Sequence, residues 1–169
     1  MTNMIRRMFR AALLDWKIYE ELEADTSALY QALGVVLLSS FAAAIGSSTG
    51  LSALPLSIIT HVLVWFIWAA LTYWIGTRIL PEATTRADLG ELLRTIGFAA
   101  SPGLIRVLGI VPDLRAYIFW AAAVWMLLAV VVAVRQALDY SSTARAVLVC
   151  LIGWLIQILF LLLATTRVR

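Results

Sequence analysis

Very few side chains in this sequence have the chemistry and spacing that an active or binding site needs. The 169 residues include one histidine, His61, and one cysteine, Cys150. Trp65 and Trp68 follow His61 at helical spacing, and an imidazole beside indole rings can ligate the metal of a haem or a chlorophyll-type pigment. The commoner role of such a histidine is one hydrogen bond to a neighbouring helix. Both alternatives stay open, and the rigid aromatic surface would also suit a carotenoid.

Arg106 is the residue whose position is energetically most demanding, because it lies inside an apolar stretch. A cation deep in a membrane helix costs about 2.5 kcal/mol or more, although a long side chain near a helix end can reach the interface. Arg106 should lie at a depth near that of His61. Its ordinary role is to reach outward, with a contact to Asp113. The alternative is a site for an anion or a lipid headgroup.

The sequence lacks the patterns of common enzymes and metal sites. It contains no Ser–His pairing, phosphate loop or His-Glu-x-x-His helix. No carboxylate lies well inside an apolar stretch, which weakens the case for coupled transport. Basic residues do not gather among aromatics, so a nucleic-acid partner is not expected. We predict no catalysis and no metal site. A small channel or lipid-handling protein that uses Arg106 and His61 is an alternative.

The elements that must hold these residues are five apolar stretches. Hydrophobic residues make up 63% of the chain and charged residues 14%, whereas soluble domains carry about 45–50% and about 25%. A spanning helix needs roughly 20 apolar residues. The predicted spans are Ala28–Ser47, Leu56–Gly76, Leu92–Ile110, Leu114–Val134 and Ala144–Thr165. The sequence therefore predicts an all-α integral membrane protein, with a five-helix transmembrane bundle over residues 28–169.

The first 27 residues form a separate region in this prediction. Apolar residues recur at steps of three and four over residues 3–24, with basic residues on the opposite face, which is typical of an amphipathic helix. Such a helix lies in the membrane interface or packs on the cytosolic ends of the spans. An acidic hinge follows, from Glu20 to Asp25. We predict an interfacial helix and hinge over residues 1–27, retained rather than cleaved as a signal.

Basic residues predict the orientation, because cytosolic loops of membrane proteins carry an excess of Lys and Arg. Five spans with a cytosolic N-terminus leave four of the 13 basic residues outside, namely Arg106, Arg115, Arg167 and Arg169. If residues 92–110 re-enter the cytosolic side instead of crossing, only Arg135 and Arg145 lie outside. Charge alone slightly favours the re-entrant arrangement.

Two residues inside the spans should shape the helix packing. Pro102 removes a backbone hydrogen bond and is expected to kink the third span, where Gly97, Gly103 and Gly109 allow tight contact. Gln157 lies at the middle of the fifth span. An amide there usually bonds to another helix, which contributes about 0.6–2 kcal/mol.

The run from Gly97 to Pro102, Gly-Phe-Ala-Ala-Ser-Pro, resembles the G-[YF]-x-x-x-P element of the Yip family, the Ypt/Rab-interacting multi-pass membrane proteins. Residues 15–32 and 133–145 resemble the segments before the first and last spans of bacterial members. The resemblance implies five spans and a cytosolic N-terminus, so that residues 92–110 cross. The acidic-aromatic element of eukaryotic members is missing, and a small GTPase partner is therefore not carried over.

From the resemblance and the expected helix contacts, we predict a non-catalytic scaffold or an accessory subunit of a larger assembly. Its partners would be membrane lipids and other membrane protein subunits, in the bacterial inner membrane with the C-terminus outside. The residues predicted for the family motif and helix packing are Gly97, Phe98, Pro102 and Gln157. The alternative sites are Arg106 for an anion or lipid headgroup, and His61 with Trp65 and Trp68 for a pigment or haem.

Overall fold

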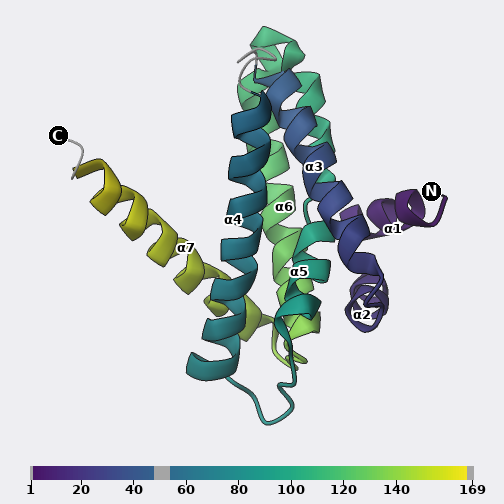
Figure 1. Ribbon diagram of the computed structural model, residues 1–169, viewed down its shortest axis with the longest axis vertical. Coiled ribbons are helices and arrows are strands. Elements are labelled where there is room, and N and C mark those ends of the chain that lie inside the picture. Colours follow the sequence, from purple (N-terminus) through teal and green to yellow (C-terminus); the bar gives the residue numbers. More distant parts are fainter. Residues whose placement is uncertain (1, 48–53, 167–169) are drawn as a thin grey trace.

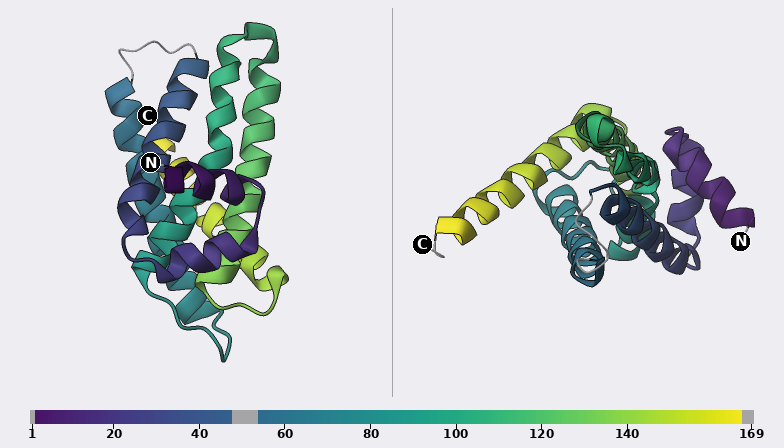
Figure 2. Two further views of the ribbon diagram at one scale, coloured as in Figure 1. Left: turned by 90° about the vertical axis from the view of Figure 1, so that its right-hand side faces the viewer. Right: turned by 90° about the horizontal axis from the view of Figure 1, so that it is seen from above.

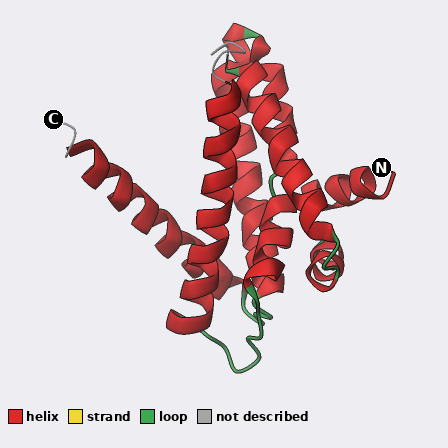
Figure 3. Ribbon diagram, in the orientation of Figure 1, coloured by secondary structure: helices red, strands yellow, loops and turns green. Residues whose placement is uncertain are grey.

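The computed structural model describes residues 2–47 and 54–166, and every regular element in these ranges is a helix (Figure 3). An elongated bundle forms the centre of the molecule (Figure 1). Its elements are α3 (Ala28–Gly46), α4 (Leu54–Trp74) with the π-helical turn η2 (Ile75–Ile79), α5 (Leu89–Phe98) with the 3-10 helix η3 (Ser101–Ile110), and α6 (Arg115–Ala137).

Three further helices lie around this bundle. α1 (Thr2–Ala12) and α2 (Trp16–Ala24) run across its outside rather than along it (Figure 2). α7 (Thr143–Thr166) starts beside the bundle and then leaves it at an angle (Figure 1). We call the end of the bundle where α3 begins the α2 end, and the opposite end, which holds η4 (Pro112–Leu114), the η4 end.

Four segments are long and apolar enough to cross a bilayer: Ala28–Gly46, Leu54–Ile79, Leu89–Ile110 and Pro112–Ala137. Many of their large apolar side chains face outward, including Leu63, which is 55% exposed, and Trp120, which is 73% exposed. Such a surface suits acyl chains rather than water. The predicted all-helical membrane architecture is confirmed for these four segments by length and composition. α7, with 24 residues, is a fifth long apolar helix, and its crossing stays a prediction. Arg167 and Arg169, used in the charge count, lie outside the described residues.

The third segment, Leu89–Ile110, runs from the α2 end to the η4 end and does not double back (Figure 2). It changes its winding on the way, because α5 ends at Phe98 and the 10 residues of η3 form a 3-10 helix. A 3-10 helix rises about 2.0 Å per residue, so α5 and η3 together reach about 35 Å, enough for a hydrocarbon core of about 30 Å. The sequence predicted a kink at Pro102. In the structure the chain instead changes from an α-helix to a 3-10 helix, which has fewer residues per turn and a longer rise per residue.

Pro102 lies in the first turn of η3, where its missing N–H leaves no helical hydrogen bond unmade. Turn bonds carry the backbone through the change: Ala100 N donates to Gly97 O at 3.2 Å, and Gly103 N donates to Ala100 O at 2.9 Å. The hydroxyl of Ser101 also donates to Phe98 O at 2.7 Å. These contacts satisfy polar groups that an apolar surrounding cannot.

The prediction of one amphipathic helix over residues 3–24 is wrong, because the chain breaks between α1 and α2. Leu14 has a φ of 60°, a left-handed conformation that ends a helix. Asp15 caps α2 by accepting a hydrogen bond from a backbone N–H two residues later. The break places Tyr19 in the core, where its hydroxyl donates to Ala11 O at 3.0 Å.

The core is concentrated near the α2 end, where α2 packs against α5 and α6. Its fully buried large side chains are Ile18, Tyr19 and Leu22 of α2, Leu92, Thr95 and Phe98 of α5, Val134 of α6, and Leu138, with Val35, Thr72, Ile75 and Val149 from the other elements. The predicted domain boundary after residue 27 stays a prediction, although α2 shares this core with the bundle. α4 differs from the other bundle helices, since only Ala69 and Thr72 of its residues are buried.

α3 and α5 approach each other closely at Gly97. A β-carbon placed on Gly97 would lie 2.7 Å from Cβ of Ala32. Two carbon atoms at that distance are about 1 Å inside their normal contact. A larger residue would therefore separate the two helices.

Replacing Gly97 by alanine should lower the thermal midpoint of the detergent-solubilised protein by roughly 2–12 °C, because overpacking costs about 1–3 kcal/mol. The matched control is Gly153→Ala in α7, where the nearest atom to a new β-carbon is Cη2 of Trp68 at 3.4 Å. We expect the control to melt at or above the wild-type temperature. An equal fall in both variants would contradict the close approach of α3 and α5.

Candidate functional site

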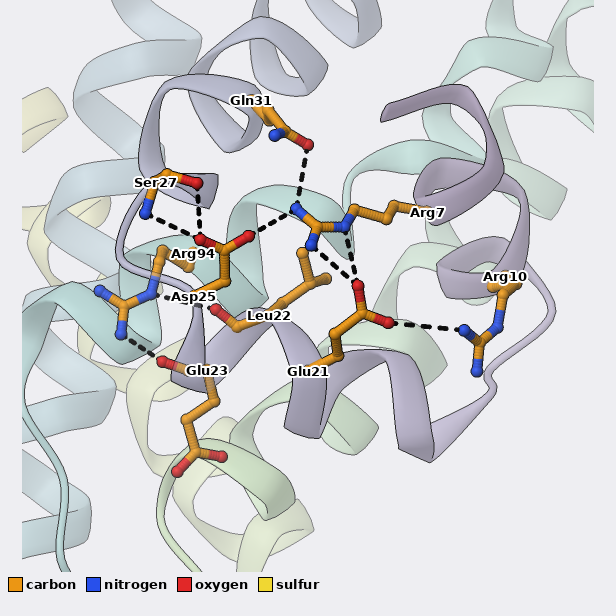
Figure 4. A network of polar contacts seen from close by, with 9 residues as sticks. All are labelled: Arg7, Arg10, Glu21, Leu22, Glu23, Asp25, Ser27, Gln31 and Arg94. Carbon is orange, nitrogen blue, oxygen red and sulfur yellow. Dashed lines mark hydrogen bonds and ion pairs between the residues drawn. The ribbon is translucent and has the colours of Figure 1, made fainter. Parts of the chain in front are cut away.

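Arg7 is buried at the α2 end and ties α1 to three other parts of the chain. The residue is 6% exposed. Its Nη2 donates to Glu21 Oε1 at 2.8 Å, its Nη1 lies 2.8 Å from Asp25 Oδ2, and Nη1 also donates to Gln31 Oε1 at 3.3 Å (Figure 4). Two carboxylates and an amide thus compensate one buried cation, as a buried charge requires. The contacts join α1 to α2, to Asp25 in the link after α2, and to α3. The predicted hinge from Glu20 to Asp25 is wrong in its extent, because residues 20–24 are helical.

Arg94 also binds the C-terminal end of α2, through backbone carbonyls. Its Nε donates to Leu22 O at 3.1 Å and its Nη2 donates to Glu23 O (Figure 4). Both carbonyls belong to the last turn of α2, where they have no helical partner, and a cation is favoured there by the helix dipole. Arg94 is buried. No site role was predicted for Arg94 from the sequence, although it is a cation near the start of the predicted span Leu92–Ile110.

The contacts of the Arg7 network shift the pKa values of its members. Burial alone would lower the pKa of Arg7, but Glu21 and Asp25 outweigh this effect and raise the pKa. Hydrogen bonds from Ser27 and from Arg7 lower the pKa of Asp25. Arg7 and Asp25 are therefore both charged at neutral pH, and the network persists there.

A cavity of about 560 Å³ opens beside this network. Its walls carry four carboxylates, those of Glu20, Glu23, Glu91 and Asp139. Burial, together with the charges of the other three, raises the pKa of Glu23 to about 7, while the charge of Arg94 acts in the opposite direction. Glu23 therefore gains or loses its charge near neutral pH.

Glu23→Gln should reduce the pH dependence of stability. The pKa of Glu23 is about 7 in the folded protein and 4.5 ordinarily, so the folded state binds the proton more tightly and loses stability as the pH rises through this interval. The wild-type protein should melt at a lower temperature at pH 8 than at pH 5. The variant should lose most of this difference and melt roughly 2–4 °C above wild type at pH 8, the shift expected for about 1 kcal/mol.

The control for this measurement is Asp113→Asn, which removes an exposed carboxylate at the η4 end. It should keep the wild-type pH dependence of the melting temperature. If Glu23→Gln also keeps it, the carboxylate at position 23 does not titrate in this range.

The predicted stripe of His61, Trp65 and Trp68 does not converge on one site. Nδ1 of His61 lies 2.7 Å from a backbone carbonyl of the preceding turn. Nε1 of Trp65 donates across to Leu93 O in α5 at 3.1 Å. The ring of Trp68 lies against Gly153 in α7. The two indoles therefore make packing contacts with different helices, and the pigment or haem site stays a prediction.

The structure does bring Arg106 and His61 together. They come from η3 and α4 and line one cavity of about 470 Å³ at the η4 end. Nε of Arg106 has no hydrogen-bond partner among the described residues, and its Cζ lies 5.7 Å from the centre of the Phe119 ring. Within the described part of the chain none of the ion pairs involves Arg106, so the contact considered with Asp113 is not formed.

The predicted packing residues have two different surroundings. Gly97, Phe98 and Pro102 are all buried, and Phe98 is fully enclosed. Gln157 lies on α7 and is partly exposed, and its amide makes no hydrogen bond within the described residues. The first three residues therefore pack inside the bundle. Gln157 forms no hydrogen bond to another helix among the described residues.

The sequence model of the Yip1 domain matches residues 16–165. The match runs from the start of α2 almost to the end of α7 and includes the Gly97–Pro102 run. Comparisons with curated proteins and with solved structures find no match. Because the matched range covers most of the chain, and the chain contains long apolar helices, the protein is a member of the Yip family of membrane proteins.

Proposed function

We propose that this protein is a non-catalytic membrane scaffold or accessory subunit, and that α7 binds a transmembrane helix of another membrane protein. The observation that carries the proposal is Gln157, an amide near the middle of a long apolar helix, which forms no hydrogen bond within the described residues. Acyl chains offer no hydrogen-bond partner, so a polar side chain at this depth is most stable against another helix.

The direction of α7 supports this proposal. Its first turns pack on the bundle through the buried residues Ala146, Val149 and Cys150. The second half of the helix moves away from the bundle (Figure 1), and Trp154 and Leu155 are 55% and 65% exposed.

One face of α7 carries Trp154, Gln157 and Ile158, because Gln157 and Ile158 lie three and four residues after Trp154. An amide flanked by large apolar side chains is the kind of surface that packs against a helix within a bilayer.

The proposed topology has five spans with the N-terminus in the cytosol and the C-terminus outside, in a bacterial cytoplasmic membrane. With 24 residues, α7 is about 36 Å long and can cross even when tilted. This orientation leaves nine of the 13 basic residues on the cytosolic side, and that excess of Lys and Arg supports it. Ile5, Phe9, Leu13 and Trp16 are all at least half exposed, which suits α1 and the start of α2 to the acyl boundary of the membrane surface.

The test is purification of the tagged full-length protein from its native membrane in a gentle detergent, with mass spectrometry of the proteins that co-purify. A distinct membrane protein should be recovered in a stable ratio. Gln157→Leu should lower its recovery about 3- to 30-fold, which corresponds to the loss of about 0.6–2 kcal/mol of interhelical hydrogen bonding.

The matched control is Gln136→Leu, the same chemical change at the end of α6. It should leave the recovery of the partner unchanged. If the wild-type protein runs alone, or only with a second copy of itself, the proposed function is wrong. An equal loss of the partner in both variants would contradict the role of α7.

A further inference from the structure

The winding of η3 sets the direction of Arg106. A 3-10 helix has three residues per turn, so residues three apart lie in one row along its surface. Gly103, Arg106 and Gly109 form such a row. The two glycines have close neighbours: a β-carbon on Gly103 would collide with Ser39 of α3, and one on Gly109 would lie 2.8 Å from the Phe119 ring of α6. The row therefore faces α3 and α6, and Nε of Arg106 is buried although the residue is partly exposed.

The cavity that receives this side chain is built at the level of a membrane interface. Each wall comes from the end of a different helix. Ser47 follows the last residue of α3, Ser57 lies in the first turn of α4, and Phe119 lies one turn into α6. Arg106 is four residues from the end of η3. If the bundle crosses a bilayer, this level corresponds to the headgroups and the first carbons of the acyl chains.

Among the described lining residues of the cavity, Arg106 has no carboxylate to balance its charge. The other lining residues in that set are alanine, leucine, serine, threonine, histidine and phenylalanine. The Phe119 ring lies 5.7 Å from Cζ of Arg106, which is within the range of a cation–π contact. That contact leaves the N–H groups at the edge of the guanidinium plane to donate. A guanidinium whose Nε is buried without a partner among the described residues is a site for an anion.

The remaining polar groups suit a headgroup that also carries hydroxyls. The hydroxyls of Ser57 and Thr60 are in the lining. His61 also lines the cavity, and its Nδ1 lies 2.7 Å from Ser57 O. Because a carbonyl can only accept, Nδ1 carries the proton of this hydrogen bond.

We propose that this cavity binds the phosphate group of an anionic membrane phospholipid, with the guanidinium of Arg106 donating to the phosphate oxygens. A zwitterionic choline lipid fits less well. Its quaternary ammonium needs a carboxylate or an aromatic face, and the phenyl ring of Phe119 among the described lining residues already contacts Arg106. The site lies away from the exposed half of α7, so it does not depend on the proposed partner.

The experiment is native mass spectrometry of the full-length protein in detergent, titrated with phosphatidylglycerol, with phosphatidylcholine and with inorganic phosphate. Wild-type protein should retain one phosphatidylglycerol more tightly than phosphatidylcholine. Arg106→Leu should weaken this binding about tenfold or more, the effect of losing a charge-assisted hydrogen bond. The variant should still fold, because it removes an uncompensated cation, and thermal melting checks this.

Two further variants separate the cavity from general charge. Arg115→Leu removes a cation at the same end of the bundle that does not line the cavity and donates instead to Gly109 O at 3.0 Å. It should bind phosphatidylglycerol like wild type. Ala44→Leu keeps Arg106 but fills part of the cavity, and it should release the lipid as Arg106→Leu does.

Each other outcome overturns the proposal in a defined way. Equal retention of phosphatidylcholine, or unchanged binding by Arg106→Leu, would exclude an anionic lipid at Arg106. Equal weakening by Arg115→Leu would point to non-specific surface charge. Unchanged binding by Ala44→Leu would exclude the cavity. Binding of inorganic phosphate as tightly as the lipid would assign the same phosphate site to a soluble anion and overturn the lipid source.

Discussion

A backbone surrounded by hydrocarbon must make its hydrogen bonds within the protein, and the structure of the bundle follows from this constraint. It leaves few ways to accommodate Pro102. The chain places the proline in the first turn of a 3-10 helix, where no donor is missed, and uses a serine hydroxyl and turn bonds to cover the change of winding. The longer rise per residue lets 22 residues extend from one end of the bundle to the other.

The same need for partners explains the α2 end, where the charged residues are concentrated. Arg7 and Arg94 are buried, but each has its own acceptors: carboxylates for the first, and the unpaired carbonyls of a helix end for the second. These contacts attach a surface helix to the bundle without burying an unpaired charge. At the η4 end Arg106 lacks such acceptors within the described residues, and that contrast is the reason to look for a ligand there.

The positions of the long helices could be predicted from the sequence because each is a run of apolar residues between polar or proline-containing links. The starts of α3 and α6 were predicted to within one residue. The common level of Arg106 and His61 also followed from counting residues inward from the span ends. These properties depend on local composition, which the sequence contains directly.

Other features depend on contacts between distant residues and could not be predicted in this way. The break before α2 requires Leu14 to adopt a left-handed conformation, which the core position of Tyr19 compensates. The apolar periodicity of residues 3–24 continues through this break and therefore does not reveal it. Likewise, an apolar run does not reveal whether α7 packs along the bundle or leaves it, and a proline does not reveal a 3-10 helix of 10 residues. The role of Arg94 requires knowing where α2 ends.

The 3-10 winding of η3 determines both the length of the segment Leu89–Ile110 and the direction of the Arg106 side chain. A 3-10 helix turns by about 120° per residue and an α-helix by about 100°, so rewinding the four steps from Pro102 to Arg106 rotates the guanidinium by about 80°. The same change to an α-helix shortens the segment, because the rise per residue falls from about 2.0 Å to about 1.5 Å. A thinner bilayer that favoured the shorter α-helical form would therefore rotate Arg106 away from the side of the helix that now holds Gly103 and Gly109.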